Sequence, residues 1–283
     1  MPNSSSNKNR SRRLAGLIGG SIVATLALAL VPQTAQAVPS SERCGPVTLI
    51  IVRGSNEAAG TGMSASGYAY ASGGVGALSR LVSTIEADPQ VPVYTESIIY
   101  PASIVPTTED PIYTASRDVG VANLTAEMND LAATCPATNM WLAGYSQGAD
   151  VIGRTLSSPN AVSLSQRAKI LFNGAVFFGD PTYHPGELIN AAPNTQSGLT
   201  SVTRDVGSLD SWTGTSPVLG EIPKIQSFCY ELDIVCQGPG LNHDIDSHGV
   251  YFSAGESTYS TTAAAFLKQF IISPQRLAPN VVN

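Results

Sequence analysis

Ser146 lies at the centre of residues 144–148, which read Gly-Tyr-Ser-Gln-Gly and match the pattern Gly-x-Ser-x-Gly. This pattern is typical of a serine nucleophile at a sharp turn between a strand and a helix. The positions two before and two after the serine have no room for a side chain in such a turn, so glycine stands at both. The sequence therefore predicts Ser146 as a nucleophile, with a chance match in a Gly- and Ser-rich chain as the alternative.

The segments on either side of the pentapeptide fit the strand and the helix that the turn must join. Residues 139–143 form a short apolar run, which predicts a buried strand. Residues 149–156 place Ile152 and Leu156 four apart, which is a helical spacing. This context favours the nucleophile over the chance match.

A serine nucleophile needs a general base, and the base needs an acid that orients it. Asp233 is the preferred acid because it lies between Cys229 and Cys236, and a bridge closing so short a segment would hold its carboxylate in place. Glu231 and Asp180 are the competing acids. Asp180 precedes a proline and is more easily interpreted as a turn residue.

The histidines that could act as the base are His184, His243 and His248. His248 is preferred because the apolar and aromatic residues 249–252 can anchor its backbone. His243 follows a Pro-Gly pair and precedes Asp244, which favours a mobile turn in solvent. His184 comes before the preferred acid and so falls outside the order Ser, acid, His that hydrolases with this turn share.

The first 37 residues predict a secretory signal peptide. Four basic side chains precede an apolar run over residues 14–31, and residues 35–37, Ala-Gln-Ala, fit a cleavage site. A membrane anchor is the alternative, since the run approaches spanning length. The cleavage site, and the glycine and serine within the run, favour removal. We expect a secreted, extracellular domain over residues 38–283, with the export route left open.

Charge and cysteine content limit the partners of the predicted mature chain. It carries 15 − 4 = 11 basic and 21 acidic side chains, a net charge near −10. This charge argues against nucleic acid and anionic membranes as partners, and no later segment could span a bilayer. An even number of cysteines in an exported protein predicts two disulfides with three possible pairings, among Cys44, Cys135, Cys229 and Cys236. Their spacing is not that of metal ligands, so we expect no metal site.

Strand-like and helix-like segments alternate along the chain. Strands are expected at residues 46–52, 93–100, 139–143, 168–178 and 224–230, and helices at 75–87, 115–134, 149–156 and 258–272. The Gly-, Ala- and Ser-rich stretch from residue 58 to about 74 is expected to be a loop. The alternation predicts an α/β fold with a parallel sheet covered on both faces, and functional residues at the carboxyl ends of the strands.

The chain resembles the cutinase family of serine esterases, which are α/β-hydrolases, in four segments that occur in the family's order. They are residues 53–57 (Arg-Gly-Ser-Asn-Glu), residues 144–148, residues 178–181 (Phe-Gly-Asp-Pro), and the Cys-x-x-x-Asp-x-x-Cys of Cys229, Asp233 and Cys236. They span most of the predicted mature chain. The last is the most diagnostic, because generic lipases lack it.

The resemblance implies a three-layer α/β/α fold without a large lid. It also implies a reaction that needs no cofactor. It implies Ser146 as nucleophile, Asp233 as acid and a histidine shortly downstream, here His248, as base. It further implies Ser55 and Gln147 as oxyanion-hole residues, and the bridges Cys44–Cys135 and Cys229–Cys236. Chain order supports the oxyanion assignment, since one donor is the amide after the nucleophile and the other comes from the loop after the first strand. The alternative for Ser55 is an ordinary loop serine.

We therefore expect a monomeric serine esterase that hydrolyses lipid, cutin, polyester or other short-to-medium acyl esters through an acyl-enzyme. An acetylxylan esterase of the same fold is one alternative. A non-catalytic surface or binding protein on a hydrolase scaffold is an alternative of another class. Residues 184–222 form a longer segment than we expect in compact family members. This segment could border the site or be a surface excursion.

Overall fold

The computed structural model describes residues 43–65, 68–104, 110–158, 160–191, 204–216, 220–240, 242–253 and 257–270. These residues belong to one compact unit. The predicted signal peptide, residues 1–37, lies outside the described residues, as do residues 38–42 and the chain after residue 270. None of the helices within the described ranges is both long and apolar enough to cross a membrane.

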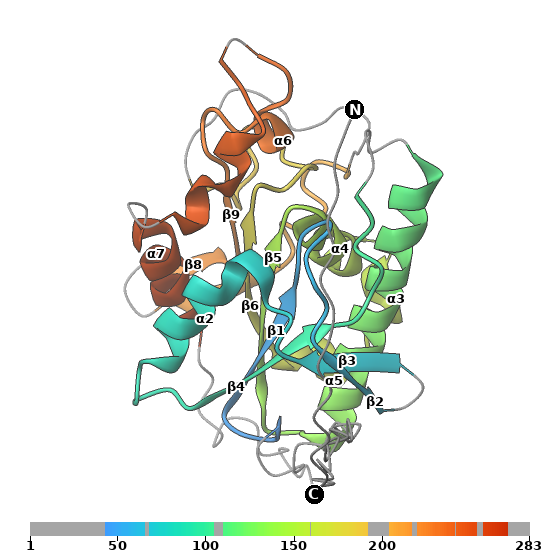
Figure 1. The fold of residues 1–283 in the computed structure, drawn as a ribbon. Helices are drawn as coiled ribbons and strands as arrows, with labels where there is room; N and C mark the ends of the chain where they lie inside the picture. The colour runs from blue at the N-terminus through green and yellow to red at the C-terminus, as the bar shows by residue number, and fades with distance from the viewer. Residues whose placement is uncertain are drawn as a thin grey trace, which may run out of the picture. The chain divides into compact units, whose positions relative to one another are not determined.

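A seven-stranded sheet forms the centre of this unit, in the order β2-β3-β4-β1-β5-β6-β9 (Figure 1). Its strands are β1 (Val47–Val52), β2 (Thr61–Ala65), β3 (Tyr68–Ser72), β4 (Val93–Ile98), β5 (Asn139–Tyr145), β6 (Phe172–Phe178) and β9 (Ile225–Phe228). The five strands from β4 to β9 pair in parallel, which confirms the predicted parallel sheet. β2 and β3 add an antiparallel edge.

Helices cover both faces of the sheet (Figure 1). One face carries η1 (Gly76–Leu78), α2 (Ser79–Glu86), η3 (Asp246–Phe252) and α7 (Ser257–Lys268). The other carries α3 (Pro111–Thr134), α4 (Gln147–Leu156) and α5 (Gln166–Leu171). The remaining elements are η2 (Asn160–Ser163), α6 (Ile234–Gln237) and a separate hairpin of β7 (Thr213–Ser216) and β8 (Gly220–Pro223). The three-layer α/β/α fold is thereby confirmed.

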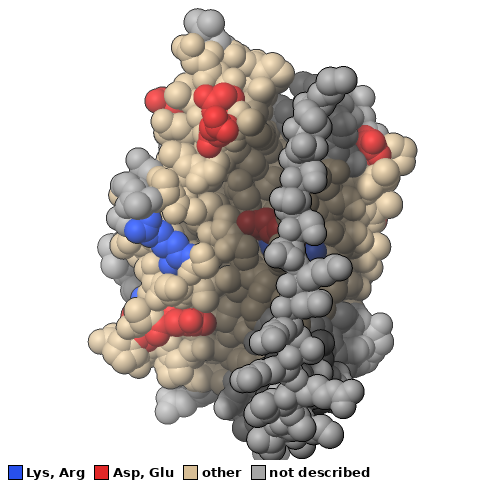
Figure 2. Space-filling model, in the orientation of Figure 1, with Lys and Arg blue, Asp and Glu red and all other residues tan. Residues whose placement is uncertain are grey.

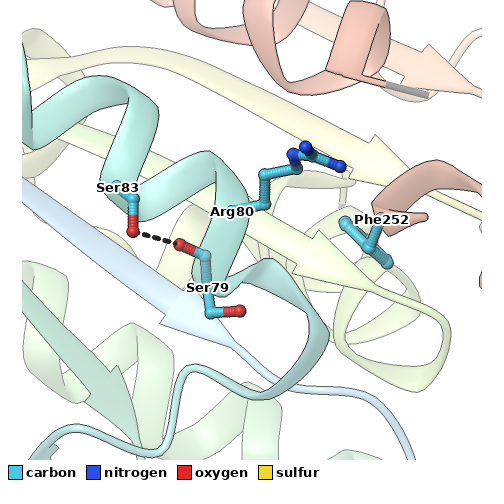
Figure 3. A pocket seen from close by; sticks show the side chains of 4 residues that line it. All are labelled: Ser79, Arg80, Ser83 and Phe252. Atoms are coloured by element: carbon cyan, nitrogen blue, oxygen red, sulfur yellow. Dashed lines mark hydrogen bonds between the residues drawn. The ribbon is translucent and has the colours of Figure 1, made fainter. Parts of the chain in front are cut away.

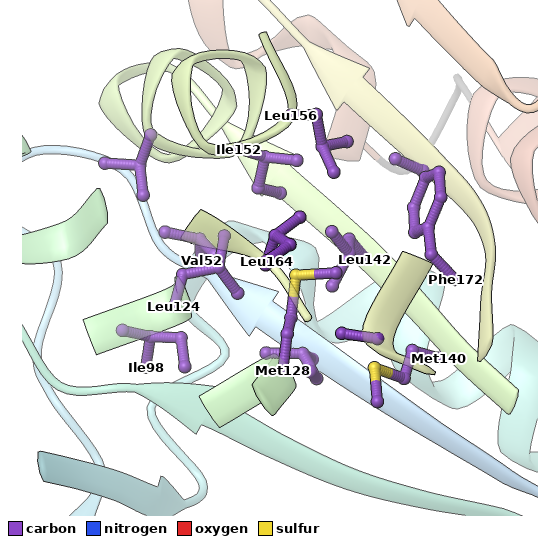
Figure 4. Close-up of a cluster of buried hydrophobic side chains, with 14 of the residues drawn as sticks. Val52, Ile98, Leu124, Met128, Met140, Leu142, Ile152, Leu156, Leu164 and Phe172 are labelled. Atoms are coloured by element: carbon purple, nitrogen blue, oxygen red, sulfur yellow. The ribbon is translucent and has the colours of Figure 1, made fainter. Parts of the chain in front are cut away.

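The side chains of β1 alternate between two hydrophobic cores. Leu49 and Ile51 pack with residues of α2 and α7. Ile50 and Val52 pack on the opposite side with residues of α3 and α4, as Figure 4 shows for Val52. All six residues of β1 are buried. A strand buried on both faces has no polar side, which is why the sequence shows a continuous apolar run here rather than an alternating one.

Two of the stretches that differ from the sequence prediction were expected to have another type of secondary structure. Residues 58–74, expected to be a loop, contain the β2–β3 hairpin, which joins the sheet by pairing Tyr70 with Ile98. Residues 168–171, expected to begin a strand, end α5 instead, a helix whose N-terminus is capped by the side chain of Ser165. Strand pairing and helix capping decided these segments, and neither is visible in the apolar pattern.

The described part of the segment 184–222 packs against the sheet and α4. Trp212 donates its indole N–H to the carbonyl of Leu156, and its ring contacts the ring of Phe172 edge-on. Leu156 is the last residue of α4, so this contact lies at the end of the helix remote from Ser146. Residues 192–203 and 217–219 lie outside the described residues.

Candidate active site

Ser146 forms the turn between β5 and α4, with a backbone φ of 55° and ψ of −123°. A positive φ is rare for residues other than glycine and is often found at functional sites. A Cβ at Gly148 would collide with the carbonyl oxygen of Val52, and one at Gly144 would lie 2.7 Å from the backbone of Gly148. Glycine is therefore required at both positions, and Ser146 stays half-buried at the tip of the turn.

His248 and Asp233 form a close pair at the carboxyl end of the sheet. The Nδ1 atom of His248 lies 3.0 Å from Oδ1 and 2.9 Å from Oδ2 of Asp233. Asp233 is fully buried and His248 is 7% exposed. A carboxylate in this position holds the proton on Nδ1, so Nε2 is left as the basic nitrogen of the ring.

Three local contacts fix the carboxylate of Asp233. Asp233 caps α6, where its Oδ1 accepts a hydrogen bond from the amide of Val235 at 2.9 Å. The hydroxyl of Tyr251 donates to Oδ2 at 2.7 Å. The disulfide Cys229–Cys236 closes the segment that contains the acid. Burial raises the pKa of Tyr251 well above its ordinary value, so this hydroxyl keeps its proton and donates.

The second disulfide joins Cys44, just before β1, to Cys135 at the end of α3. The two observed bridges exclude the other pairings that the cysteine count allowed. The pairing implied by the resemblance is therefore confirmed.

Tyr145 connects the His248–Asp233 pair to the turn at Ser146. Its ring stacks on the imidazole of His248, with centroids 4.8 Å apart and planes 27° apart. Its hydroxyl donates to the carbonyl of His248 at 3.1 Å. Because Tyr145 directly precedes Ser146, these contacts place the imidazole beside the backbone of the nucleophile turn.

Gly179, directly after the end of β6, lies against both residues of the pair. It has a φ of +59°, and a Cβ there would lie 2.5 Å from Cε1 of His248 and 2.9 Å from Oδ2 of Asp233. Only a glycine leaves room for both side chains. The Nε2 atom of His248 is buried and accepts no hydrogen bond from the described residues.

The loop after β1 is held rigidly beside Tyr145. Arg53 donates to the carbonyls of Glu57 and Tyr100, at 2.7 and 2.6 Å, and the Glu57 carboxylate accepts from the amide of Gly54 at 2.7 Å. A Cβ at Gly54 would lie 2.7 Å from the ring of Tyr145. The next residue, Ser55, is half-buried. The structure therefore brings the Ser55 loop to the same place as the nucleophile turn.

Gln147 is fully buried, and its side chain ties α4 to two other segments. Its Oε1 accepts from the hydroxyl of Ser116 on α3 at 2.9 Å, and its Nε2 donates to the carbonyl of Ser103 at 3.3 Å. Ser103 in turn donates its amide to the Ser116 hydroxyl at 3.0 Å. This triangle fixes the first residue of α4, whose amide directly follows Ser146.

The competing residues lie in other environments. His243 is half-buried and its Nδ1 lies 2.7 Å from the carbonyl of Gly238, while the half-buried His184 offers its carbonyl to Asn190. Glu231 is exposed. Asp180 is fully buried and accepts from Thr182, and its burial raises its pKa above the ordinary value. The described part of the chain contains no cluster of three or more His, Cys, Asp or Glu side chains that could hold a metal ion.

Sequence reasoning missed the roles of Tyr145, Gly179 and Gln147's side chain in this arrangement. Tyr145 and Gln147 lie inside the recognised pentapeptide, and Gly179 lies in the Phe-Gly-Asp-Pro segment. Their contacts depend on which strands are neighbours, which these short motifs do not encode. Residues 249–252, which were expected to anchor His248, include Tyr251, whose hydroxyl also binds Asp233.

The parallel sheet between two helical layers, with a strained serine between strand and helix, defines an α/β-hydrolase fold. Within this class, the chain belongs to the cutinase family, because the family model described as Cutinase matches residues 43–271.

Individual relatives agree with this family. Carboxylesterase Culp1 of Mycobacterium tuberculosis is 28% identical over 257 residues, covering 90% of this chain and 95% of that protein. The catalytic core domain of acetyl xylan esterase from Trichoderma reesei has a TM-score of 0.59 at 25% identity, covering 80% of this chain and 99% of that one. A cutinase-like protein from Cryptococcus sp. has a TM-score of 0.57 at 20% identity, over 80% and 96%, and bears on the fold alone. The prediction of a carboxylic ester hydrolase is confirmed at this level.

Proposed function

We propose that this protein is an exported serine esterase with Ser146 as nucleophile, His248 as base and Asp233 as orienting acid. Nε2 of His248 takes the hydroxyl proton as Oγ of Ser146 attacks the ester carbonyl. The tetrahedral intermediate collapses to an acyl-enzyme, and His248 returns the proton to the departing alcohol. Water, activated by the same imidazole, then releases the acid and restores Ser146.

The Asp233–His248 pair is the observation that carries this proposal. A buried carboxylate within 3.0 Å of Nδ1 fixes the tautomer and stabilises the imidazolium that forms when Nε2 takes a proton. Nε2 has no hydrogen-bond partner among the described residues, so its lone pair is free to accept the proton of Ser146. Catalytic hydrogen bonds commonly tighten only when substrate is bound. The stacking of Tyr145 on His248 supports Ser146 as that donor.

We further propose that the amides of Gln147 and Ser55 bind the oxyanion. Gln147 is the first residue of α4, and the first amides of a helix have no partner within it. The triangle of Gln147, Ser103 and Ser116 would hold that amide in a constant direction. Arg53 and Glu57 would do the same for the loop that carries Ser55. Losing one such donor costs ~3 kcal/mol of transition-state stabilisation.

The substrate class is an ester of a short-to-medium acyl chain, including cutin and polyesters, as the resemblance to the cutinase family implies. The similarity to the acetyl xylan esterase of Trichoderma reesei favours a second candidate, the removal of acetate from xylan. Hydrolysis of p-nitrophenyl esters from acetyl to palmitoyl, with acetylated xylan and cutin alongside, distinguishes them. Activity confined to acetate and xylan would select the second candidate. No turnover of any ester would support a non-catalytic binding protein.

Export as a monomer is part of the same proposal. Two disulfides fit an oxidising compartment, and residues 1–37 have the composition of a cleaved signal peptide. N-terminal sequencing of the secreted protein should give Val38 as the first residue. An uncleaved protein in the membrane fraction would contradict this prediction.

A further inference from the structure

A hollow of about 340 Å³ lies between α2 and η3, on the same face of the sheet as His248. Ser79, Arg80 and Ser83 of α2 line one side, and Phe252 of η3 lines the other. Figure 3 shows the Arg80 side chain extending from the helix toward Phe252. The hydroxyl of Ser83 donates to the carbonyl of Ser79 at 3.0 Å, which leaves its lone pairs and the exposed Ser79 hydroxyl to face solvent.

The guanidinium of Arg80 has N–H groups that form no hydrogen bond within the described residues. Its Nη1 donates to the carbonyl of Ser253, and within the described residues no carboxylate forms an ion pair with it. The side chain is half-buried, so part of the guanidinium faces the hollow. Charged side chains form small separate groups on the face drawn in Figure 2. A guanidinium matches carboxylate and phosphate oxygens in a planar, two-point geometry.

The hollow borders the candidate active site on two sides. Phe252 follows His248 by four residues in η3, and its ring contacts Tyr145 edge-on with centroids 5.1 Å apart. On the other side α2 continues from η1, where the amide of Ala77 donates to the carboxylate of Glu57 at 2.6 Å. Glu57 also closes the Ser55 loop. Tyr145 and the Ser55 loop, which both adjoin the proposed nucleophile, therefore each contact an element that lines or adjoins the hollow.

We propose that this hollow binds an oxyanion, a carboxylate or a phosphate, carried by the part of the ester substrate remote from the scissile bond. Arg80 supplies the charge, the two serines supply further hydrogen bonds and Phe252 contacts the connecting carbon chain. The cation at this point would offset the repulsion between an anionic ester and the predicted mature chain, whose net charge is near −10. This inference rests on the proposed esterase activity and adds a preference among its substrates.

The test compares two p-nitrophenyl esters with the same six-carbon acyl chain, the neutral hexanoate and the monoester of adipic acid, which ends in a carboxylate. Arg80→Gln should raise KM for the adipate about three- to tenfold, which corresponds to roughly 0.7 to 1.4 kcal/mol of lost binding free energy. The same variant should leave kcat and KM for the hexanoate unchanged. Arg80→Lys should keep most of the preference, because it keeps the charge.

Arg167→Gln is the matched control. Arg167 also donates to a backbone carbonyl, that of Pro136, and also lacks an ion pair within the described part of the chain, but it lies on α5 across the sheet. This variant should leave kcat and KM unchanged for both esters. The inference would be overturned if KM for the adipate were equal in the wild-type protein and in Arg80→Gln. Hydrolysis of the hexanoate would still report esterase activity in that case. Failure of the wild-type protein on both esters would instead overturn the proposed function.

Inorganic phosphate, added at constant ionic strength, distinguishes a substrate-borne anion from a free one. It should raise KM for the adipate in the wild-type protein, and should leave the hexanoate and Arg80→Gln unaffected. Equal inhibition of both esters that depends on Arg80 would contradict the assignment to the substrate. That result would indicate a site for free phosphate.

Discussion

The ring of Tyr145 stacks on the imidazole of His248 across 4.8 Å, and its hydroxyl donates to the backbone carbonyl of the same histidine. One side chain therefore holds both the ring and the backbone of the proposed base. Tyr145 is itself fixed in sequence next to Ser146. Its ring also lies against Gly54, one residue before Ser55. The residues proposed for attack, proton transfer and oxyanion binding thus meet around one tyrosine.

Tyr145→Ala should lower kcat by roughly 10- to 100-fold, because a displacement of about 1 Å in a catalytic group can cost ~10²-fold in rate. KM should change little, since the tyrosine is proposed to position His248 rather than to hold substrate. Tyr145→Phe keeps the ring and should retain most of the activity. Steady-state kinetics of both variants, with circular dichroism to verify folding, test this. Equal kcat values for the two variants would refute a role for the stacked ring.

His248→Ala should lower the acylation rate by roughly 10³-fold or more, as loss of a triad base does. His243→Ala is the matched control, since the imidazole of His243 bonds the carbonyl of Gly238 and no carboxylate among the described residues, and it should lower the rate less than about tenfold. Stopped-flow release of p-nitrophenol measures both rates. An inactive His243→Ala beside an active His248→Ala would reverse the assignment and leave the esterase activity standing.

The core of the fold could be predicted because buried parallel strands have a distinctive sequence. Residues 46–52 and 139–143 are short, mostly apolar runs, and both form central strands covered on two faces. The hairpin β2–β3 was missed because its small residues carry no periodic signal and its place is set by pairing with β4. The strand expected at 168–178 begins at Phe172, because residues 168–171 belong to α5, a helix that starts at the N-cap Ser165.

The candidate site was predicted where chemistry is encoded locally. Ser146, Asp233 and His248 stand in short motifs, and the structure brings the last two together. The contacts that hold them are long-range, such as Gln147 with Ser116, and depend on which helix packs against which. No periodicity or motif contains that information. The roles of these side chains in catalysis stay predictions.

The two disulfides should differ in effect when replaced by serine pairs. Cys44–Cys135 closes 91 residues and Cys229–Cys236 closes 7, which corresponds to about 4.5 and 2.5 kcal/mol of chain entropy. Removing the first should lower the melting temperature more. Removing the second should lower kcat more, because it frees the segment that holds Asp233. Calorimetry and kinetics on both double variants check this, and the opposite ranking would contradict it.

The buried carboxyl of Asp150 should make the free energy of unfolding depend on pH. It is fully buried on α4, and burial raises its pKa to about 6, against the opposing charge of Arg154. The carboxyl of Asp150 therefore binds a proton more tightly in the folded protein than in the unfolded chain, where its pKa is near 4. The contribution to stability is present below pH ~4 and is lost as pH rises through about 6, a change of up to ~3 kcal/mol.

Asp150→Asn removes this ionisation and keeps the size of the side chain. The free energy of unfolding of the wild-type protein, relative to this variant, should fall between pH 4 and pH 7. Urea denaturation at half-unit intervals of pH measures the difference. Parallel curves for the two proteins would show that Asp150 does not titrate in this range.

The central claim is that Ser146 is the nucleophile, and a fluorophosphonate tests it most directly. This reagent phosphonylates a serine only when a neighbouring base and oxyanion hole activate it. Intact mass spectrometry should show one adduct, and peptide mapping should place it on Ser146. Ser146→Ala, with an unchanged melting temperature, should take up no reagent and hydrolyse no ester. An adduct on another serine, or esterase activity retained in Ser146→Ala, would contradict the account.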